Sequence, residues 1–357
     1  MEQFGFLLHP LQVNDLARKF TISKQIPDSI LRQIIRFMPQ IELSHVTGIE
    51  SELGNKAEGW LVGCTLTSEQ MLKLPVEHVL KQIISAAKKA EKLGAEIVGL
   101  GAYTSIIGDG GRRVAEKLDI PVTTGNSYTV ATAVKAVKRA ADKLGIVLSE
   151  THLAVIGATG SIGEACVQLL ADEVNDISLV ARNEPKLRRL TTSIKSNYQL
   201  NRVNYSTDIN KALSEAEIVI TVSSAIDSII DPNNLKPGAI VCDVARPRDV
   251  AKQVNESRED ILVIEGGIVQ LPGQVRLNFD LGLPPGRIYA CMAETIILAL
   301  EGRYENYTLG KSVSLEKVKE IQQLADKHGF QLAGLRYVGE KIGQQRFKQV
   351  RQAASRA

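Results

Sequence analysis

The fold of this chain is decided by the stretch HLAVIGATGSIGEACVQLLADEV at residues 152–174. An apolar run typical of a buried strand comes first, and a segment with apolar residues at helical spacing comes last. The glycines between them allow a tight turn, a close approach of backbone N–H groups to a pyrophosphate, and close packing of helix on strand. The stretch therefore predicts a dinucleotide site at the positive helix end, formed by Gly157, Thr159, Gly160, Ser161, Ile162 and Gly163.

Four more short apolar runs follow at residues 176–182, 217–224, 239–245 and 261–267, separated by helical or loop-like segments. Five such runs indicate one doubly wound parallel sheet, the architecture of a Rossmann domain. In such a sheet the nucleotide lies beyond the carboxyl ends of the strands. We therefore expect three more residues to bind the cofactor: Ser223, Ser224 and Gly266.

The second run ends in Arg182 and Asn183, where NAD enzymes carry an acidic residue that binds the ribose 2′-hydroxyl. A carboxylate at this place would repel a 2′-phosphate, whereas a guanidinium binds it through charge-assisted hydrogen bonds. The sequence therefore predicts NADPH as the cofactor, bound through Arg182 and Asn183.

The N-terminal part alternates in the same way. Strand-like segments lie at residues 4–8, 57–66, 95–102 and 120–125, and helical segments lie at 76–93 and 127–145. This alternation predicts a second parallel sheet, whose ligands gather beyond the carboxyl ends of the strands. The loops at that edge predict a substrate site with Tyr103, Thr104, Ser105, Thr124 and Asn126. The alternative is that these residues only cap helices and shape turns.

At 357 residues the chain is too long for one ordinary core. We expect an α/β fold of three parts: an N-terminal α/β substrate-binding domain at 1–146, an NADP-binding Rossmann domain at 147–270, and a C-terminal helical segment at 271–357 that bridges the cleft. In the last part we expect one helix from near Arg287 to about Leu300 and another from Ser314 to His328. A basic, polar tail is expected from Arg336 onward.

Composition excludes several other classes of protein. Hydrophobic residues make up 44% and charged residues 23%, and the net charge of +3 comes from interleaved acids and bases, which argues against a nucleic-acid partner. The four cysteines form no CxxC pair or zinc-ligand spacing, and no carboxylate cluster indicates a fixed metal. The chain begins without a signal-peptide pattern and has no apolar run near the roughly 20 residues that span a bilayer. We therefore expect a cytoplasmic protein with reduced thiols and no integral membrane contact.

Cys291 follows a turn at 283–287 and precedes an apolar helical pattern that reaches Leu300. The first turn of such a helix offers unpaired N–H groups and a positive end, and Arg287 adds a positive charge, so a thiolate is favoured. We therefore predict Cys291 as a nucleophile. The alternative is a small buried residue, which is the commoner role of a cysteine. No histidine lies at a predicted cleft strand end, and we predict no general acid.

Six segments resemble, in the same order, segments of the cyanobacterial long-chain acyl-[acyl-carrier-protein] reductases. They lie at residues 4–9, 103–107, 123–126, 157–160, 181–183 and 289–294. The resemblance covers nearly the whole chain. It implies that Cys291 takes the acyl group of an acyl carrier protein or coenzyme A thioester, and that NADPH reduces it to a fatty aldehyde in lipid metabolism. It also allows a stimulating Mg²⁺ ion.

Three segments depart from this resemblance. DVARPRD, at 243–249, is more similar to the corresponding segment of glutamyl-tRNA reductases and shikimate dehydrogenases, and the loop at 274–286 and the tail after Gly334 also differ. We expect the basic tail either to steer an acidic carrier protein or to form a solvated helix or a frayed terminus. The departures leave the acyl chain length and the carrier open.

Two other functions are compatible with the same sequence. A dehydrogenase of the shikimate or amino-acid type would have the same N-terminal α/β domain and Rossmann domain. It would reduce a ketone without a covalent intermediate. Such an enzyme needs a proton donor, and no Lys/Asp pair lies at the predicted cleft strand ends. A nucleotide-binding protein without turnover is the other alternative. The sequence leaves the oligomeric state open.

Overall fold

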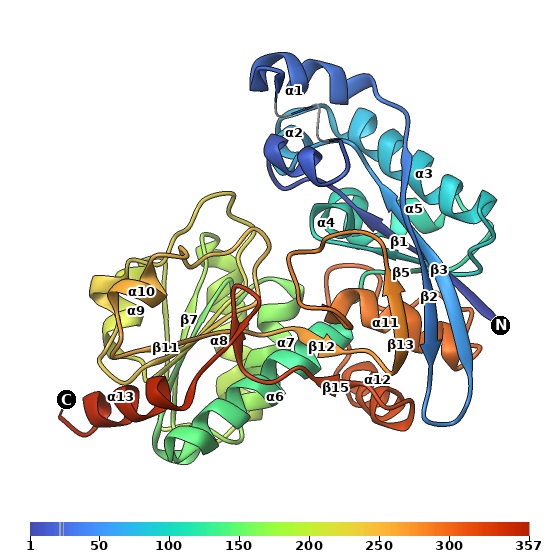
Figure 1. Cartoon of the computed structure of the whole chain (residues 1–357). Coiled ribbons are helices and arrows are strands. Elements are labelled where there is room, and N and C mark those ends of the chain that lie inside the picture. Colours follow the sequence, from blue (N-terminus) through green and yellow to red (C-terminus); the bar gives the residue numbers. More distant parts are fainter. Residues whose placement is uncertain (21–22, 24, 357) are drawn as a thin grey trace. The chain divides into compact units, whose positions relative to one another are not determined.

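The computed structural model describes residues 1–20, 23 and 25–356, and its chain divides into two compact units. Unit 1 comprises Met1–Tyr128 and Val269–Gln331, and unit 2 comprises Thr129–Ile268 and Leu332–Ala357. Each unit contains its own sheet and helices (Figure 1), which confirms the expected α/β class. Residues 271–357 are divided between the units, and the three domains expected from the sequence stay a prediction.

Unit 1 is built on a six-stranded sheet with the order β13-β2-β3-β1-β4-β5. Its strands are β1 (Glu2–Leu8), β2 (Ile41–Glu50), β3 (Lys56–Gly63), β4 (Val98–Leu100), β5 (Val122–Thr123) and β13 (Gly273–Leu277). Its helices are α1 (Asp28–Phe37), α2 (Ser68–Lys73), α3 (Val76–Lys92), α4 (Tyr103–Gly110), α5 (Arg112–Ala115), α11 (Ala290–Leu300) and α12 (Leu315–Lys327). The predicted parallel pairing holds for β3, β1, β4 and β5. The sheet is nevertheless mixed, because β2 and β13 pair antiparallel.

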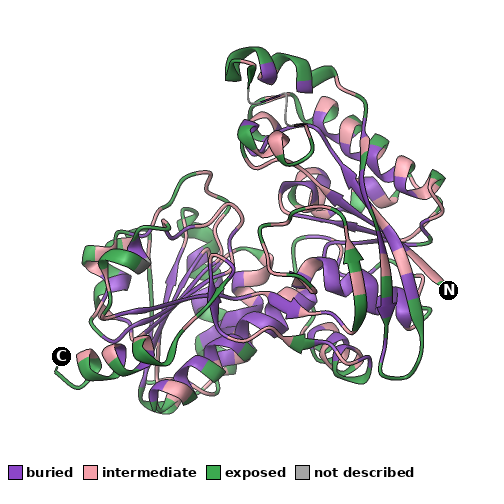
Figure 2. Ribbon diagram, viewed as in Figure 1, coloured by how far each residue is buried: buried purple, intermediate pink, exposed green. Residues whose placement is uncertain are grey.

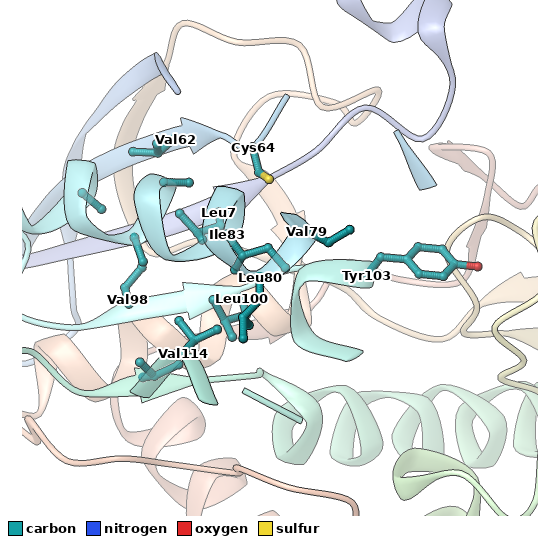
Figure 3. Close-up of a cluster of buried hydrophobic side chains, with 14 of the residues drawn as sticks. Leu7, Val62, Cys64, Val79, Leu80, Ile83, Val98, Leu100, Tyr103 and Val114 are labelled. Atoms are coloured by element: carbon teal, nitrogen blue, oxygen red, sulfur yellow. The ribbon is translucent and has the colours of Figure 1, made fainter. Parts of the chain in front are cut away.

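Helices α3 and α11 cover opposite faces of this sheet. Leu7 belongs to the aliphatic cluster beneath α3, together with Val79 and Ile83 (Figure 3). On the other face, Gly99 lies so close to α11 that an added Cβ would be 2.1 Å from the hydroxyl of Thr295. Consequently, α11 is buried along nearly its whole length (Figure 2). The helix that carries Cys291 is therefore part of the core of unit 1.

Unit 2 is built on a parallel sheet with the order β11-β10-β9-β6-β7-β8. Its strands are β6 (His152–Ile156), β7 (Asp176–Val180), β8 (Arg202–Ser206), β9 (Ile218–Thr221), β10 (Ile240–Asp243) and β11 (Leu262–Glu265). Its helices are α7 (Ser161–Leu170), α8 (Glu184–Asn197), α9 (Ile209–Glu215), α10 (Val254–Ser257) and α13 (Gln344–Ala354). This is the doubly wound order of the Rossmann fold, which reverses between β6 and β9. All five predicted strands are confirmed.

The remaining elements are short or pass from one unit into the other. Helix α6 (Asn126–Leu144) begins in unit 1 and continues in unit 2. Two small sheets are formed by β14 (Arg287–Tyr289), β12 (Ile268–Gln270) and β15 (Gln331–Leu332), and by β16 (Arg336–Tyr337) and β17 (Glu340–Lys341). Within the described residues, no helix combines the length and the apolar character needed to cross a membrane.

Two predictions of local structure are wrong. Tyr103, Thr104 and Ser105 were expected in a loop but form the first turn of α4, because the Thr104 and Ser105 hydroxyls donate to the carbonyls of Gly101 and Ala102 at 2.8 and 2.7 Å. The helix expected from near Arg287 begins at Ala290, since residues 287–289 form β14 with Ile288 buried. The basic tail ends in α13, as one of its two alternatives expected, and this helix buries Phe347 and Val350.

Candidate functional site

The glycine turn of unit 2 lies at the reversal point of the sheet. Gly157 has a φ of +88°, and a Cβ there would be 2.7 Å from the carbonyl oxygen of Val222, which follows β9. A Cβ at Gly163 would be 2.3 Å from the carbonyl oxygen of Gly157, so α7 packs tightly on the turn. The N–H groups of Gly157 and Ala158 both donate to the carbonyl of Val180, at the end of β7. The ends of β6, β7 and β9 therefore meet at this turn.

The start of α7 fits a pyrophosphate. The helix begins at Ser161, and its N-cap residue is Gly160, which has no side chain that could cap the first turn. Gly160 is also exposed, so no side chain blocks the approach to the first helical turn. The first N–H groups of a helix have no partner within the helix and, together with the helix dipole, favour an anion. The six residues predicted from the glycine pattern are therefore together in the structure.

Arg182 and Asn183 follow β7 beside this turn but differ in their contacts. Arg182 is exposed. The side chain of Asn183 accepts a hydrogen bond from the N–H of Lys186 at 3.0 Å and caps α8. A neighbouring cation, Arg188, is paired with Glu184 at 2.8 Å. Arg182 is thus the better placed of the two predicted residues for a 2′-phosphate, since the described contact of Asn183 is structural.

A buried carboxylate that the sequence did not single out holds the turn after β9. Asp249 is fully buried and accepts hydrogen bonds from the Ser223 hydroxyl at 2.5 Å, from the Ser223 N–H at 2.9 Å and from the Thr221 hydroxyl. Ser223 is therefore fixed next to the glycine turn, while Ser224 is exposed. Gly266 is buried, and a Cβ there would be 2.6 Å from the sulfur of Cys242, so packing accounts for this glycine.

The segment at 243–249 is anchored by two more buried acids. Burial raises the pKa of Asp243 to about 7, although the charge of Arg246 lowers it. Burial alone would also raise the pKa of Glu265, but the charges of Arg246 and Arg248 hold it below its ordinary value. Both arginines contact one oxygen of Glu265, at 2.9 and 2.7 Å. This network explains how a strongly charged segment folds against the sheet.

In unit 1, Cys291 is the second residue of α11, which confirms its predicted place in the first helical turn. Residues 123–128 run from the end of β5 into the first turn of α6, and this 123–128 turn packs directly on it. Gly125 has a φ of +72°, and a Cβ there would lie 2.2 Å from Cα and 2.4 Å from Cβ of Cys291. The structure therefore brings Cys291 together with the segment that contains Thr124 and Asn126.

Cys291 differs from the other three cysteines in its exposure. Cys64, Cys166 and Cys242 are buried, whereas Cys291 is half-buried. Burial raises the pKa of Cys64 and of Cys166 to about 12, and that of Cys242 well above its ordinary value. A thiol with so high a pKa is a poor nucleophile at neutral pH. Exposure and helix position therefore favour Cys291 as the reactive cysteine.

The predicted substrate residues are mostly committed to internal contacts. Tyr103 and Thr104 are fully buried, and the buried Thr124 donates its hydroxyl to the carbonyl of Thr308 at 2.5 Å.

The expectation that no histidine lies at a strand end is wrong, because His9 directly follows β1 and its Nε2 accepts the Tyr103 N–H at 3.1 Å. Burial lowers the pKa of His9 to about 4, so the ring is neutral at pH 7.

Glu294 is a further residue that the sequence reasoning missed. It lies three positions after Cys291 on α11 and is fully buried. Burial raises the pKa of its carboxyl, and hydrogen bonds from Thr123 and Tyr128 lower it. Residues three apart share one face of a helix, so this spacing from the cysteine is the signal that could have found it.

Comparison with known proteins gives similarities in two classes. Residues 138–264 match the family described as shikimate / quinate 5-dehydrogenase. The chain is 33% identical over 355 residues to the aminotransferase PigE of Serratia sp., a match that covers 96% of this chain and 41% of that protein. It is 29% identical over 342 residues to the long-chain acyl-[acyl-carrier-protein] reductase of Synechococcus elongatus, covering 92% of this chain and 97% of that protein.

Among solved structures, the L-tryptophan dehydrogenase from Nostoc punctiforme aligns with a TM-score of 0.45 and 12% identity, over 99% of this chain and 88% of that one. The chain thus spans less than half of the aminotransferase but nearly the full length of the reductase. The family match lies entirely within unit 2, where the glycine turn lies. The family match and the similarity to the reductase relate the chain to NAD(P)-dependent oxidoreductases of the Rossmann type.

Proposed function

We propose that this chain reduces a fatty acyl thioester to a fatty aldehyde with NADPH, through an acyl group carried on Cys291. One observation carries the proposal. Of the four cysteines, all of which lie in the described part of the chain, Cys291 alone is not buried, and it occupies the first turn of a core helix. The similarity to a reductase over 97% of that protein supports the same reaction. The aminotransferase name belongs to a much longer protein and is not extended to this chain.

The first step is an acyl transfer. The Cys291 thiolate attacks the thioester carbonyl of an acyl carrier protein or of coenzyme A, a C–S bond to Cys291 forms, and the C–S bond to the carrier breaks. The carrier thiolate leaves and takes a proton from water. One thioester replaces another, so the step is nearly balanced in energy. N–H groups in the first turn of α11 stabilise the oxyanion that forms on the carbonyl oxygen.

Bound at the glycine turn, NADPH supplies the hydride that reduces the acyl carbon. The residues proposed to hold it are Gly157, Thr159, Gly160, Ser161, Ile162 and Gly163 at the pyrophosphate, Arg182 and Asn183 at the 2′-phosphate, and Ser223, Ser224 and Gly266 near the nicotinamide. The same α11 N–H groups stabilise the hemithioacetal oxyanion on Cys291. Its collapse breaks the C–S bond, releases the aldehyde and restores the thiolate.

The remaining predicted residues are proposed to contact the acyl or pantetheine part of the donor: Tyr103, Thr104, Ser105, Thr124 and Asn126. Ser105 and Asn126 are half-buried, whereas the other three are buried and would act through the shape of the site. A stimulating Mg²⁺ ion is tested by comparing the rate of aldehyde formation in magnesium chloride and in EDTA.

Intact-mass measurement of the protein mixed with a fatty acyl thioester, without NADPH, tests the proposal. We expect the wild type to gain the mass of one acyl group, and Cys291→Ala to gain none. Cys166→Ala is the matched control, because it removes a buried cysteine and should keep the adduct. Donors on acyl carrier protein and on coenzyme A, compared across chain lengths, identify the carrier. Aldehyde formation that survives in Cys291→Ala would refute the covalent mechanism.

A dehydrogenase without a covalent intermediate is the second candidate, favoured by the family match at 138–264. It would reduce a keto substrate with NADPH, and Cys291→Ala would retain the activity. A nucleotide-binding protein without turnover would bind NADPH and give neither adduct nor product. The adduct measurement together with an NADPH-consumption assay separates the three.

A further inference from the structure

Glu294 is a carboxylate buried among neutral partners. Its side chain accepts the Thr123 hydroxyl at 2.5 Å and the Tyr128 N–H at 2.8 Å, and the Gly125 N–H and the Thr308 hydroxyl also donate to it. All four of these partners are uncharged. Burying a carboxylate without a cation is costly unless hydrogen bonds compensate. Four donors converging on one carboxylate therefore indicate a site built for an acceptor at this place.

These hydrogen bonds join both ends of the 123–128 turn. Thr123 ends β5, Tyr128 lies in the first turn of α6, and Gly125 lies between them. Gly125 is also the residue that packs on the backbone of Cys291. Glu294 thus holds the turn from the same helix that carries the cysteine, one helical turn further along.

Thr308, which follows α11 in the chain, holds the same turn as a second segment. Its φ of +51° is a left-handed conformation, which is strained for a β-branched residue. Its carbonyl accepts the Thr124 hydroxyl at 2.5 Å, and its hydroxyl lies 2.7 Å from the hydroxyl of Ser127. Strain of this kind persists only where the surrounding contacts enforce it. The turn over Cys291 is therefore fixed by contacts from two segments.

We infer that Glu294 is a positioning residue for Cys291, whose carboxylate holds the 123–128 turn against the first turn of α11. This sets the place of the sulfur and of the first-turn N–H groups relative to an acyl carbonyl. A glutamine cannot replace it fully, because its NH₂ group would face one of the converging donors. This inference rests on the proposed function, because the reaction that Glu294 assists is the transfer of the acyl group to Cys291.

The test compares Glu294→Gln with Glu301→Gln. Glu301 follows α11 at its far end and pairs with Lys327 and His328 at 2.7 and 2.8 Å, so it is a matched control. Three rates are measured: amide hydrogen exchange in residues 123–128, alkylation of Cys291 by iodoacetamide, and acyl-adduct formation. We expect Glu294→Gln to exchange faster and to form the adduct more slowly, each by about tenfold or more, because a hydrogen bond to a charged group is lost. The KM for the acyl thioester in aldehyde formation should stay within about threefold of wild type, because the turn acts on the attack by Cys291 rather than on binding of the donor. Glu301→Gln should match wild type in all three.

Exchange and adduct formation at wild-type rates in Glu294→Gln would overturn the inference. Faster exchange with unchanged adduct formation would also overturn it, because the carboxylate would then serve the fold alone. Should Glu294→Gln not fold, Thr123→Val removes one of the four hydrogen bonds and is judged by the same rates. If the wild type forms no adduct, the proposed function fails. The rate at which iodoacetamide alkylates Cys291 then tests the positioning role by itself. An altered rate in Glu294→Gln but not in Glu301→Gln would support positioning, and equal rates would refute it.

Discussion

Replacing Gly125 by alanine tests the contact between the 123–128 turn and Cys291 directly. The new Cβ would lie 2.2 Å from Cα, 2.4 Å from Cβ and 2.6 Å from the carbonyl oxygen of Cys291. No side-chain rotation relieves these contacts, because they involve the backbone of a core helix. Gly302 follows the other end of α11 with a φ of +67° and has nothing within 4 Å of its Cβ position. Gly302→Ala is therefore a matched control.

The two substitutions share one cost and differ in another. Both force alanine into a left-handed conformation, at about 1–2 kcal/mol. Only Gly125→Ala adds an overpacked contact, which costs about 1–3 kcal/mol. We expect Gly125→Ala to destabilise unit 1 by about 2–5 kcal/mol and Gly302→Ala by about 1–2 kcal/mol. If relaxation moves Cys291 by about 1 Å, acyl transfer should slow about 100-fold in Gly125→Ala alone.

The fluorescence of the tryptophan reports on unit 1, which contains both Gly125 and Gly302. Trp60 is the single tryptophan, lies in β3 and stacks on His45 at 5.2 Å between ring centroids. Its fluorescence during urea unfolding therefore follows unit 1, and intact mass follows acyl transfer. Equal losses of stability in the two variants, with adduct formation in Gly125→Ala at the wild-type rate, would refute the reasoning.

Three other substitutions have expected outcomes that can be measured in solution. Since burial lowers the pKa of His9 to about 4, the unfolded chain takes up a proton on this residue first as the pH falls. Unit 1 should therefore lose up to about 3 kcal/mol between about pH 6.5 and pH 4, a loss that His9→Gln removes in Trp60-monitored unfolding. Arg182→Asp should weaken binding of NADPH relative to NADH in titrations, because a carboxylate repels the 2′-phosphate, and an unchanged preference would reject its placement. Tyr337→Phe removes the hydroxyl that lies 3.1 and 3.0 Å from the carbonyls of Val250 and Ala251. It should destabilise unit 2 by about 1 kcal/mol, measured by limited proteolysis, without slowing adduct formation.

The Rossmann unit was predictable because most of its strands are continuous apolar runs. All residues of β6, β9, β10 and β11 are buried, so each strand appears as an uninterrupted pattern. The edge strand β8 escaped prediction because only Val203 is buried in it. In β2 the alternation of apolar and polar residues is broken by two shifts in its register with β3. Exposed edge strands and bulges are therefore the elements that the sequence pattern did not predict.

The candidate site was only partly predictable for a different reason. Cys291 could be found because a helix start is a local feature of sequence. For Glu294 the sequence offers only its spacing from Cys291, and for Asp249 it offers no signal, because a buried acid and a surface acid look the same until their partners are known. The partner Thr123 is 171 positions from Glu294 in the chain, and Ser223 is 26 from Asp249. Only the fold brings these donors to the carboxylates.

Loss of the contacts of Glu294 and loss of those of Asp249 should have opposite effects on acyl transfer and on NADPH binding. Glu294 contacts only residues of unit 1 among its described partners, and Asp249 holds Ser223 beside the glycine turn of unit 2. Thr123→Val should therefore slow adduct formation and leave NADPH affinity unchanged. Asp249→Asn should weaken NADPH binding and leave adduct formation unchanged, because the acyl transfer precedes any need for hydride. Titration of NADPH and intact mass separate these effects, and a variant that impaired both equally would mean that the carboxylates stabilise the fold without serving separate steps.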